Sequence, residues 1–193
     1  MKQKLKQAFS QGKKQRIVDT SLRRAAVLLP IYYNEGQYCI LFTKRTEMVK
    51  VHKGQISFPG GAYEEEDGTL LVTALRECSE EIGLMPDDAE ILGELDDEIS
   101  WTSNYIISPF VASIPWPYKF RADRFEVEEI FGVPISVLLE EGSLGQEMNM
   151  TNGKEFPSYY YCYEGRKIWG ATARILKKFL DILAQFMENS NRG

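Results

Sequence analysis

Apolar and polar positions alternate along the chain in short blocks typical of a sheet flanked by helices. The apolar run at residues 25–33 predicts a buried strand, and a turn at 34–36 leads into a second strand at 38–43. The two are expected to form a hairpin. Further segments with strand composition lie at residues 55–58, 90–95, 105–114 and 129–133, with a second hairpin at 158–163 and 166–168. The pattern therefore predicts a sheet of several strands.

Helical patterns separate these strands. They lie at residues 2–18, at about 69–82, at 135–140 and at 171–187. The second is the strongest, because Gly83 and Pro86 follow it as typical signals of a helix end. The last places Ile175, Phe179, Ile182 and Phe186 on one face, which indicates core packing. Strands and helices mixed in this way predict one α/β (α+β) domain, a sheet sandwiched between helices.

Composition removes several classes of protein. The chain has 193 residues, of which 44 % are hydrophobic, so it is long enough for one domain and too apolar for intrinsic disorder. Its single histidine, His52, excludes a site built from several imidazoles. Three cysteines without a CxxC pair argue against a cysteine zinc site and a disulfide framework. No GxSxG motif accompanies His52, so serine-nucleophile catalysis is not expected.

Charge is divided unevenly along the chain. Residues 1–24 carry eight cations and only Asp19 as an anion, and the rest of the chain has a net charge of −12. This excess of carboxylates disfavours nucleic acid as a partner. A basic helical arm at 1–24, preceding one domain at 25–190, is expected; the arm either meets a polyanionic ligand or is simply solvated, and we favour the second. The longest apolar run is too short to cross a membrane, so a cytoplasmic protein is expected.

The helix at 69–82 concentrates acidic residues. At 100° per residue, Glu77, Glu80 and Glu81 share one face, and the opposite face is apolar. Like charges at this spacing repel each other, so the face requires a compensating cation. Arg76 can supply part of this charge, and Mg²⁺ or Mn²⁺, which prefer oxygen ligands, can supply the rest. A solvated acidic face is the alternative.

The residues around this helix resemble the Nudix hydrolases. Gly61 is followed by five residues, Asp67, eight residues, and then the run from Arg76 to Leu84, Arg-Glu-Cys-Ser-Glu-Glu-Ile-Gly-Leu. The Nudix motif has glutamate at the position of Asp67 and one residue fewer in the spacer. The Arg-Glu-x-x-Glu-Glu core is intact. The resemblance implies the Nudix fold, a mixed sheet between helices, and divalent-metal-dependent cleavage of phosphoanhydride bonds.

The extra spacer residue and Asp67 make this motif resemble that of one subgroup of the family, the coenzyme A pyrophosphatases. Their second motif matches Leu41-Phe42-Thr43-Lys44-Arg45-Thr46, Lys50, Gly54 and Phe58-Pro59-Gly60-Gly61, with its spacing kept. Phe42, Thr46 and Lys50 are substitutions, and lysine lacks the planar fork with which arginine grips phosphate. The resemblance implies that Arg45, Lys50, His52 and Phe58 bind substrate. The substrate would be coenzyme A or a thioester, cleaved to 3′,5′-ADP and (acyl-)phosphopantetheine.

The resemblance also implies the metal and catalytic residues. The ligands of Mg²⁺ or Mn²⁺ would be Gly60 through its carbonyl, Glu77, Glu80, Glu81 and a later acid, for which Glu126 is the first candidate before Glu128 and Glu129. The catalytic base would be Glu77 or Glu80. Arg76 would orient the glutamates through ion pairs.

Two alternatives remain open, and a third is excluded. The same chemistry could act on ADP-ribose, a nucleotide sugar or a dinucleoside polyphosphate, or the chain could be a non-catalytic nucleotide sensor. The acidic loop at 64–68 lacks the alternating ligand spacing of a calcium site. Finally, Trp101, Trp116 and Tyr118 could form a partner surface, as in a homodimer, or a wall on which a base stacks; core packing is the interpretation we favour.

Overall fold

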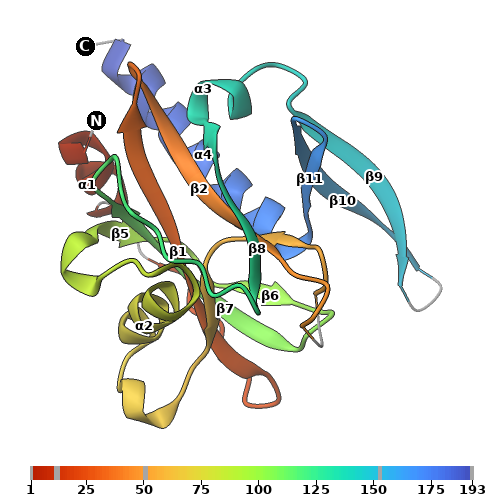
Figure 1. Ribbon diagram of the computed structural model, residues 1–193. Coiled ribbons are helices and arrows are strands. Elements are labelled where there is room, and N and C mark those ends of the chain that lie inside the picture. The colour runs from red at the N-terminus through yellow and green to blue at the C-terminus, as the bar shows by residue number, and fades with distance from the viewer. Residues whose placement is uncertain (1, 11–13, 50–51, 152–153, 192–193) are drawn as a thin grey trace.

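A computed structural model describes residues 2–10, 14–49, 52–151 and 154–191 (Figure 1). Within these residues, the chain forms two sheets and several helices. The strands of the main sheet are β1 (Arg23–Asn34), β2 (Gln37–Arg45), β3 (Ile56–Ser57), β4 (Gly60–Ala62), β5 (Glu90–Glu94), β6 (Glu98–Ser100), β7 (Tyr105–Ser113) and β8 (Val127–Pro134). The smaller sheet consists of β9 (Leu144–Thr151), β10 (Lys154–Tyr163) and β11 (Arg166–Trp169).

The main sheet is mixed, which confirms the predicted fold class. Its strands are ordered β3-β2-β1-β7-β5, and β4, β6 and β8 pair with β1, β7 and β2, respectively. The long β1–β7 pair is parallel, and the other pairings of this sheet are antiparallel. The hairpin expected at 25–43 is present as β1 and β2, with Asn34 opposite Gln37.

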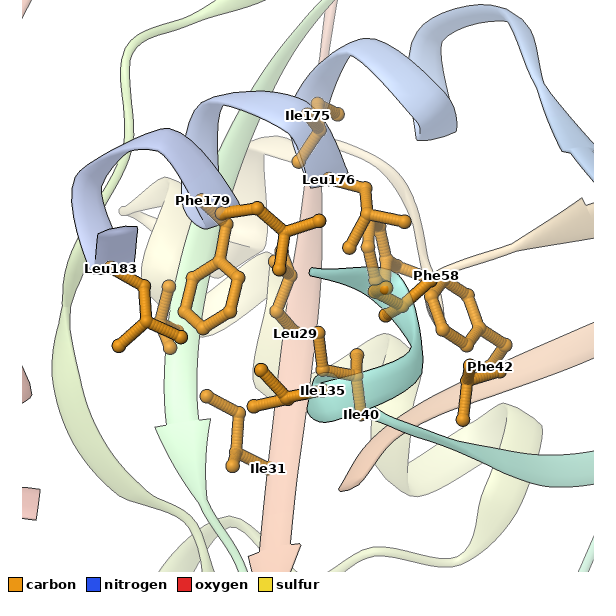
Figure 2. Close-up of a cluster of buried hydrophobic side chains, with 14 of the residues drawn as sticks. Leu29, Ile31, Ile40, Phe42, Phe58, Ile135, Ile175, Leu176, Phe179 and Leu183 are labelled. Atoms are coloured by element: carbon orange, nitrogen blue, oxygen red, sulfur yellow. The ribbon is translucent and has the colours of Figure 1, made fainter. Parts of the chain in front are cut away.

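Helices cover both faces of this sheet. The helix α2 (Leu70–Ile82) packs on one face, where Ala74, Cys78 and Ile82 share an apolar layer with residues of β1 and β2. The helix α4 (Gly170–Asn191) packs on the other face together with α1 (Lys2–Ser10), and the short α3 (Ile135–Leu138) lies at its edge. Figure 2 shows Leu176, Phe179 and Leu183 of α4 above Leu29 and Ile31 of β1. Successive β1 residues therefore serve opposite cores, as strand alternation requires.

The N-terminal segment differs from the solvated arm that the sequence suggested. The helix ends at Ser10 instead of continuing to residue 18, and residues 14–19 are not helical. Leu5 and Phe9 are one turn apart and are both buried in the core beside α4. Lys2 and Lys6 form ion pairs with Glu90 of β5. The basic residues thus meet carboxylates of the domain itself, because the two apolar residues fix the helix against it.

Other bounds shift by a few residues. The strand expected at 129–133 begins at Val127, and the short helix expected at 135–140 ends at Leu138. Three strands were not predicted, namely β4, β6 and β9. No helix in the described parts of the chain is long and apolar enough to span a membrane.

Candidate active site

The acidic helix α2 is defined by its caps. The Thr69 hydroxyl accepts a hydrogen bond from the Val72 amide (3.2 Å), which satisfies one of the free N–H groups of the first turn. Gly83 has a left-handed backbone (φ +69°) and donates to the Cys78 and Ser79 carbonyls, which ends the helix. These caps agree with the helix predicted at about 69–82. They fix which face of α2 meets the sheet, and therefore where its glutamates point.

Glu81 is the most buried acid of this helix, with 4 % of the residue exposed. Its carboxylate accepts hydrogen bonds from the Arg45 guanidinium of β2 (3.1 Å) and from the Gly60 amide (3.1 Å). Burial raises the pKa of Glu81 to about 7, against the lowering effects of Arg45 and Gly60. The charges of Glu77 and Glu126 raise this pKa further.

Glu77 lies one turn earlier and faces the glycine turn. A Cβ built on Gly61 would come within 2.4 Å of the Glu77 carboxyl carbon, so only glycine leaves room for this side chain. Gly60 has φ +150°, a backbone conformation that suits glycine, and a Cβ there would meet the Ala26 carbonyl at 2.3 Å. Burial raises the pKa of Glu77 as well. The double glycine thus brings the backbone of β4 directly against the acidic helix.

Arg76 connects the acids to the loop before the helix. Its guanidinium donates to Asp67 (2.7 Å from Nε), to Glu77 (3.1 Å) and to Glu80 (3.0 Å). The ion pairs expected between Arg76 and the glutamates are therefore present. Asp67 also accepts from the Thr73 hydroxyl (2.8 Å) and the Glu64 amide (3.1 Å), and the hydrogen bond from Arg76 is the main reason that its pKa lies well below the ordinary value. Asp67 anchors Arg76.

Replacing Asp67 with asparagine should therefore destabilise the protein. The side chain of Asp67 is 3 % exposed, and breaking a buried pair by removing one partner typically costs about 3–5 kcal/mol. Because folding lowers the pKa of Asp67, its contribution is present above the unfolded-state pKa of 3.8 and is lost as pH falls below it. Urea denaturation at pH 7 should show the loss. The exposed Glu66→Gln variant is the control, and equal stability of the two variants would contradict the role of Asp67.

The donor set of this cluster fits a hard divalent cation. Glu77, Glu81 and Glu126 supply carboxylate oxygens only, the ligands that Mg²⁺ and Mn²⁺ prefer. Because Gly61 has no side chain, the Glu77 carboxylate packs directly against the backbone of β4. Within the described residues, no three His, Cys, Asp or Glu side chains converge closely enough to form a ready metal site. In this arrangement Arg45 and Arg76 balance the carboxylate charges.

Glu126 and Glu80, two of the predicted metal ligands, differ in their surroundings. Glu126 is the last residue of the loop between β7 and β8 and accepts a hydrogen bond from Arg45 (3.2 Å). It thereby joins Glu81 on the same guanidinium, although 45 residues separate the two acids in the sequence. Glu80, in contrast, is exposed and pairs with Arg76 at the rim. Glu128 pairs with Lys44, and Glu129 pairs with Arg166.

The residues expected to bind substrate are divided in space. Phe58 is 2 % exposed and stacks on Phe42 in the core beneath α4, at 4.8 Å between ring centroids. It offers no open surface to a substrate, and its role in binding stays a prediction. Arg45 faces the carboxylates instead of an open surface. His52 is half-buried, and its Nδ1 contacts the Gln55 amide oxygen at 2.8 Å. Lys50 lies outside the described residues.

The aromatic residues of the sequence also separate. Trp101 is 69 % exposed and Trp116 is 39 % exposed, so core packing was the wrong interpretation for both. Trp116 stacks on Tyr32 at the edge of a cavity, and Tyr118 is half-buried nearby. The aromatic composition of the loop was the available signal, but the chain alone does not show which rings meet.

Comparison with known proteins decides the family. Residues 22–148 match the NUDIX domain family. The chain belongs to the Nudix hydrolases. It is 34 % identical over 154 residues to a protein of Photorhabdus laumondii, with 80 % of this chain and 81 % of that protein covered. A relative from Klebsiella pneumoniae is 33 % identical over 156 residues, covering 81 % of this chain and 80 % of the relative. Both are named uncharacterised Nudix hydrolase NudL.

Solved structures share the Nudix fold. A MutT/nudix family protein from Enterococcus faecalis has a TM-score of 0.58 at 14 % identity, with 92 % of this chain and 67 % of that chain covered. The NUDIX domain of Shewanella oneidensis NrtR, crystallised with ADP-ribose, has a TM-score of 0.50 at 18 % identity, with 63 % and 78 % covered. The Nudix fold expected from the sequence is therefore confirmed, and the chain is a Nudix diphosphatase, an enzyme.

Proposed function

We propose that this Nudix enzyme cleaves the pyrophosphate bond of coenzyme A or its thioesters, giving 3′,5′-ADP and (acyl-)phosphopantetheine. One observation carries the proposal. Arg45 belongs to the segment that resembles the coenzyme A pyrophosphatases, and its guanidinium binds both Glu81 and Glu126. The two motifs therefore build one site. Phe42, a substitution in that segment, is fully buried in the core, so its change does not alter a substrate-facing surface.

Divalent metal would be held by Glu77, Glu81 and Glu126, with Glu80 at the rim and the Gly60 carbonyl completing the set that the family implies. When bound, Mg²⁺ or Mn²⁺ supplies positive charge against the phosphate oxygens and lowers the pKa of water. Such charge is needed because the anionic oxygens of a pyrophosphate repel an incoming nucleophile. The all-oxygen donor set supports either ion.

The residues of the chain supply position and proton transfer. Arg76 holds the Glu77 carboxylate at 3.1 Å while Asp67 holds Arg76, so the base is fixed before substrate enters. Of the two base candidates, Glu77 is better placed, because it is half-buried beside Gly61 and burial raises its pKa. Glu77 then accepts a proton from water as the water oxygen bonds to phosphorus. The bond between this phosphorus and the bridging oxygen breaks, and the second phosphate leaves with that oxygen as part of the other product.

The substrate is tested by assaying the purified protein with Mg²⁺ or Mn²⁺ and separating the products by chromatography. Coenzyme A, acetyl-coenzyme A, ADP-ribose and a dinucleoside polyphosphate are compared side by side. We expect 3′,5′-ADP from the first two, at a higher kcat/KM than for the others. Absence of 3′,5′-ADP at every metal concentration would refute the coenzyme A assignment. Turnover of ADP-ribose in its place would establish the alternative substrate with the same chemistry.

A further inference from the structure

A cavity of about 500 Å³ lies on the α2 side of the main sheet. Its floor includes Leu41 of β2 and Ile130 of β8, and the loop between β7 and β8 forms its wall. In Figure 1 this loop runs from the end of β7 past α2 to the start of β8. The volume is within the range of small-molecule sites. None of its lining residues belongs to the acidic cluster.

Aromatic rings form one side of this cavity. Trp116 stacks on Tyr32 with 4.0 Å between centroids and 19° between planes, and its indole N–H donates to the Asn34 side chain at 3.0 Å. The ring centroid of Phe120 lies 6.4 Å from that of Trp116 and 5.0 Å from that of Tyr118. The indole is thus held in one orientation while 39 % of the residue stays exposed. Rings fixed in this way offer a stacking surface to a planar base.

Two cations stand beside the rings. Lys119 and Arg124 both line the cavity. In the described parts of the chain, neither forms an ion pair with a carboxylate, and Arg124 donates only to the Glu128 carbonyl, at 3.0 Å. Both side chains are exposed at the cavity, where they are free to bind an anionic group. A phosphate group satisfies both.

The cavity adjoins the acidic cluster. The loop is tied to the end of α2, since the Arg121 amide donates to the Ile82 carbonyl and the Asp123 amide donates to the Glu81 carbonyl, both at 2.9 Å. Ile130 on the floor pairs with Thr43, two residues from Arg45 on the same strand. Two residues of strand span about 7 Å, and alternate residues share a face. The cavity and the acids therefore lie on one face, a short distance apart.

We propose that this cavity binds the nucleoside end of the substrate. The adenine stacks against Trp116 and Phe120, and the phosphate on the ribose is held by Lys119 and Arg124, while the pyrophosphate lies at the acids. This inference rests on the proposed function and extends it, because it names the residues that distinguish coenzyme A from dephospho-coenzyme A, which lacks the ribose phosphate. Neither ring nor cation belongs to the two sequence motifs of the family.

Binding of 3′,5′-ADP and of AMP, measured by calorimetry, tests the pocket without any turnover. The wild-type protein should bind 3′,5′-ADP at least about tenfold more tightly than AMP, because only the former carries the extra phosphate. The Lys119→Ala/Arg124→Ala variant should lose this preference and keep its affinity for AMP within about twofold. Trp116→Ala should weaken both ligands by a similar factor. Lys177→Ala, a surface cation on α4 across the sheet, is the matched control.

Equal wild-type affinities for the two ligands would overturn the proposal, as would a preference that survives in the double variant. Thermal unfolding of each variant shows whether it has kept its fold. A kinetic arm compares coenzyme A with dephospho-coenzyme A, and the double variant should raise KM for coenzyme A alone. If neither compound is cleaved, the proposed substrate fails, and the calorimetry still decides whether the pocket reads a ribose phosphate.

Discussion

Glu81→Gln should reduce kcat/KM by about a thousandfold, the scale on which a catalytic carboxylate acts, while the protein stays folded. The reason is local. Glu81 is the buried acid that shares the Arg45 guanidinium with Glu126 and receives the Gly60 amide. Glutamine keeps the shape of the side chain and removes the charge on which a divalent cation depends. Steady-state kinetics and circular dichroism measure the two effects separately.

The same variant should change how stability depends on pH in metal-free protein. Glu81 has a pKa of about 7 when folded, against an ordinary value of 4.5. Between these values the folded state holds the extra proton, so the wild-type free energy of unfolding falls as pH rises from about 4.5 to about 7. Urea denaturation in EDTA should show this fall in the wild type and a smaller one in Glu81→Gln. The exposed Glu65→Gln is the control, and parallel profiles for Glu81→Gln and wild type would contradict the assignment.

Phe179→Ala should lower the free energy of unfolding by about 3–5 kcal/mol, the usual result of truncating a buried phenylalanine. The Phe179 side chain is fully buried between α4 and the sheet (Figure 2). Its ring stacks on Phe9 of α1, with 6.1 Å between the ring centroids. Its removal leaves a cavity and loosens the contact that holds the N-terminal helix. Chemical denaturation measures the change in free energy.

Activity distinguishes this effect from damage to the site. Phe179 lies in the core on the α4 side, and the acids lie on the α2 side, so kcat/KM of the folded variant should stay near wild type. Met187→Ala on the same helix is the control, since Met187 is 45 % exposed and its removal creates no cavity. If Phe179→Ala were as stable as Met187→Ala, the Phe179 side chain would contribute nothing to the packing of this core.

The parts of the fold that the sequence predicts well are those with a local signal. Thr69 and Gly83 mark the ends of α2, and the 3.6-residue period assigns its acidic and apolar faces. The hairpin of β1 and β2 follows from two apolar runs around a turn. In each case the residues that decide the structure are neighbours in the chain.

The parts that it missed depend on distant partners. The strand β9 has a mostly polar sequence and exists through its register with β10. The polar pattern of residues 2–18 predicts one continuous helix, whereas α1 ends at Ser10. Arg16, inside the predicted helix, instead pairs with Asp97 and Glu94. In the site, a motif assigns Phe58 to the substrate, although its ring faces the core; a motif fixes position in the chain and not the face of the sheet. The meeting of Arg45 with Glu81 and Glu126 likewise requires three separate segments.

The arginine between the two acids has a consequence for assembly of the enzyme. A covalently attached positive charge is always present, whatever the supply of free ions. We therefore expect the chain to fold without a bound divalent ion, in contrast to small zinc domains, which are unfolded without their metal.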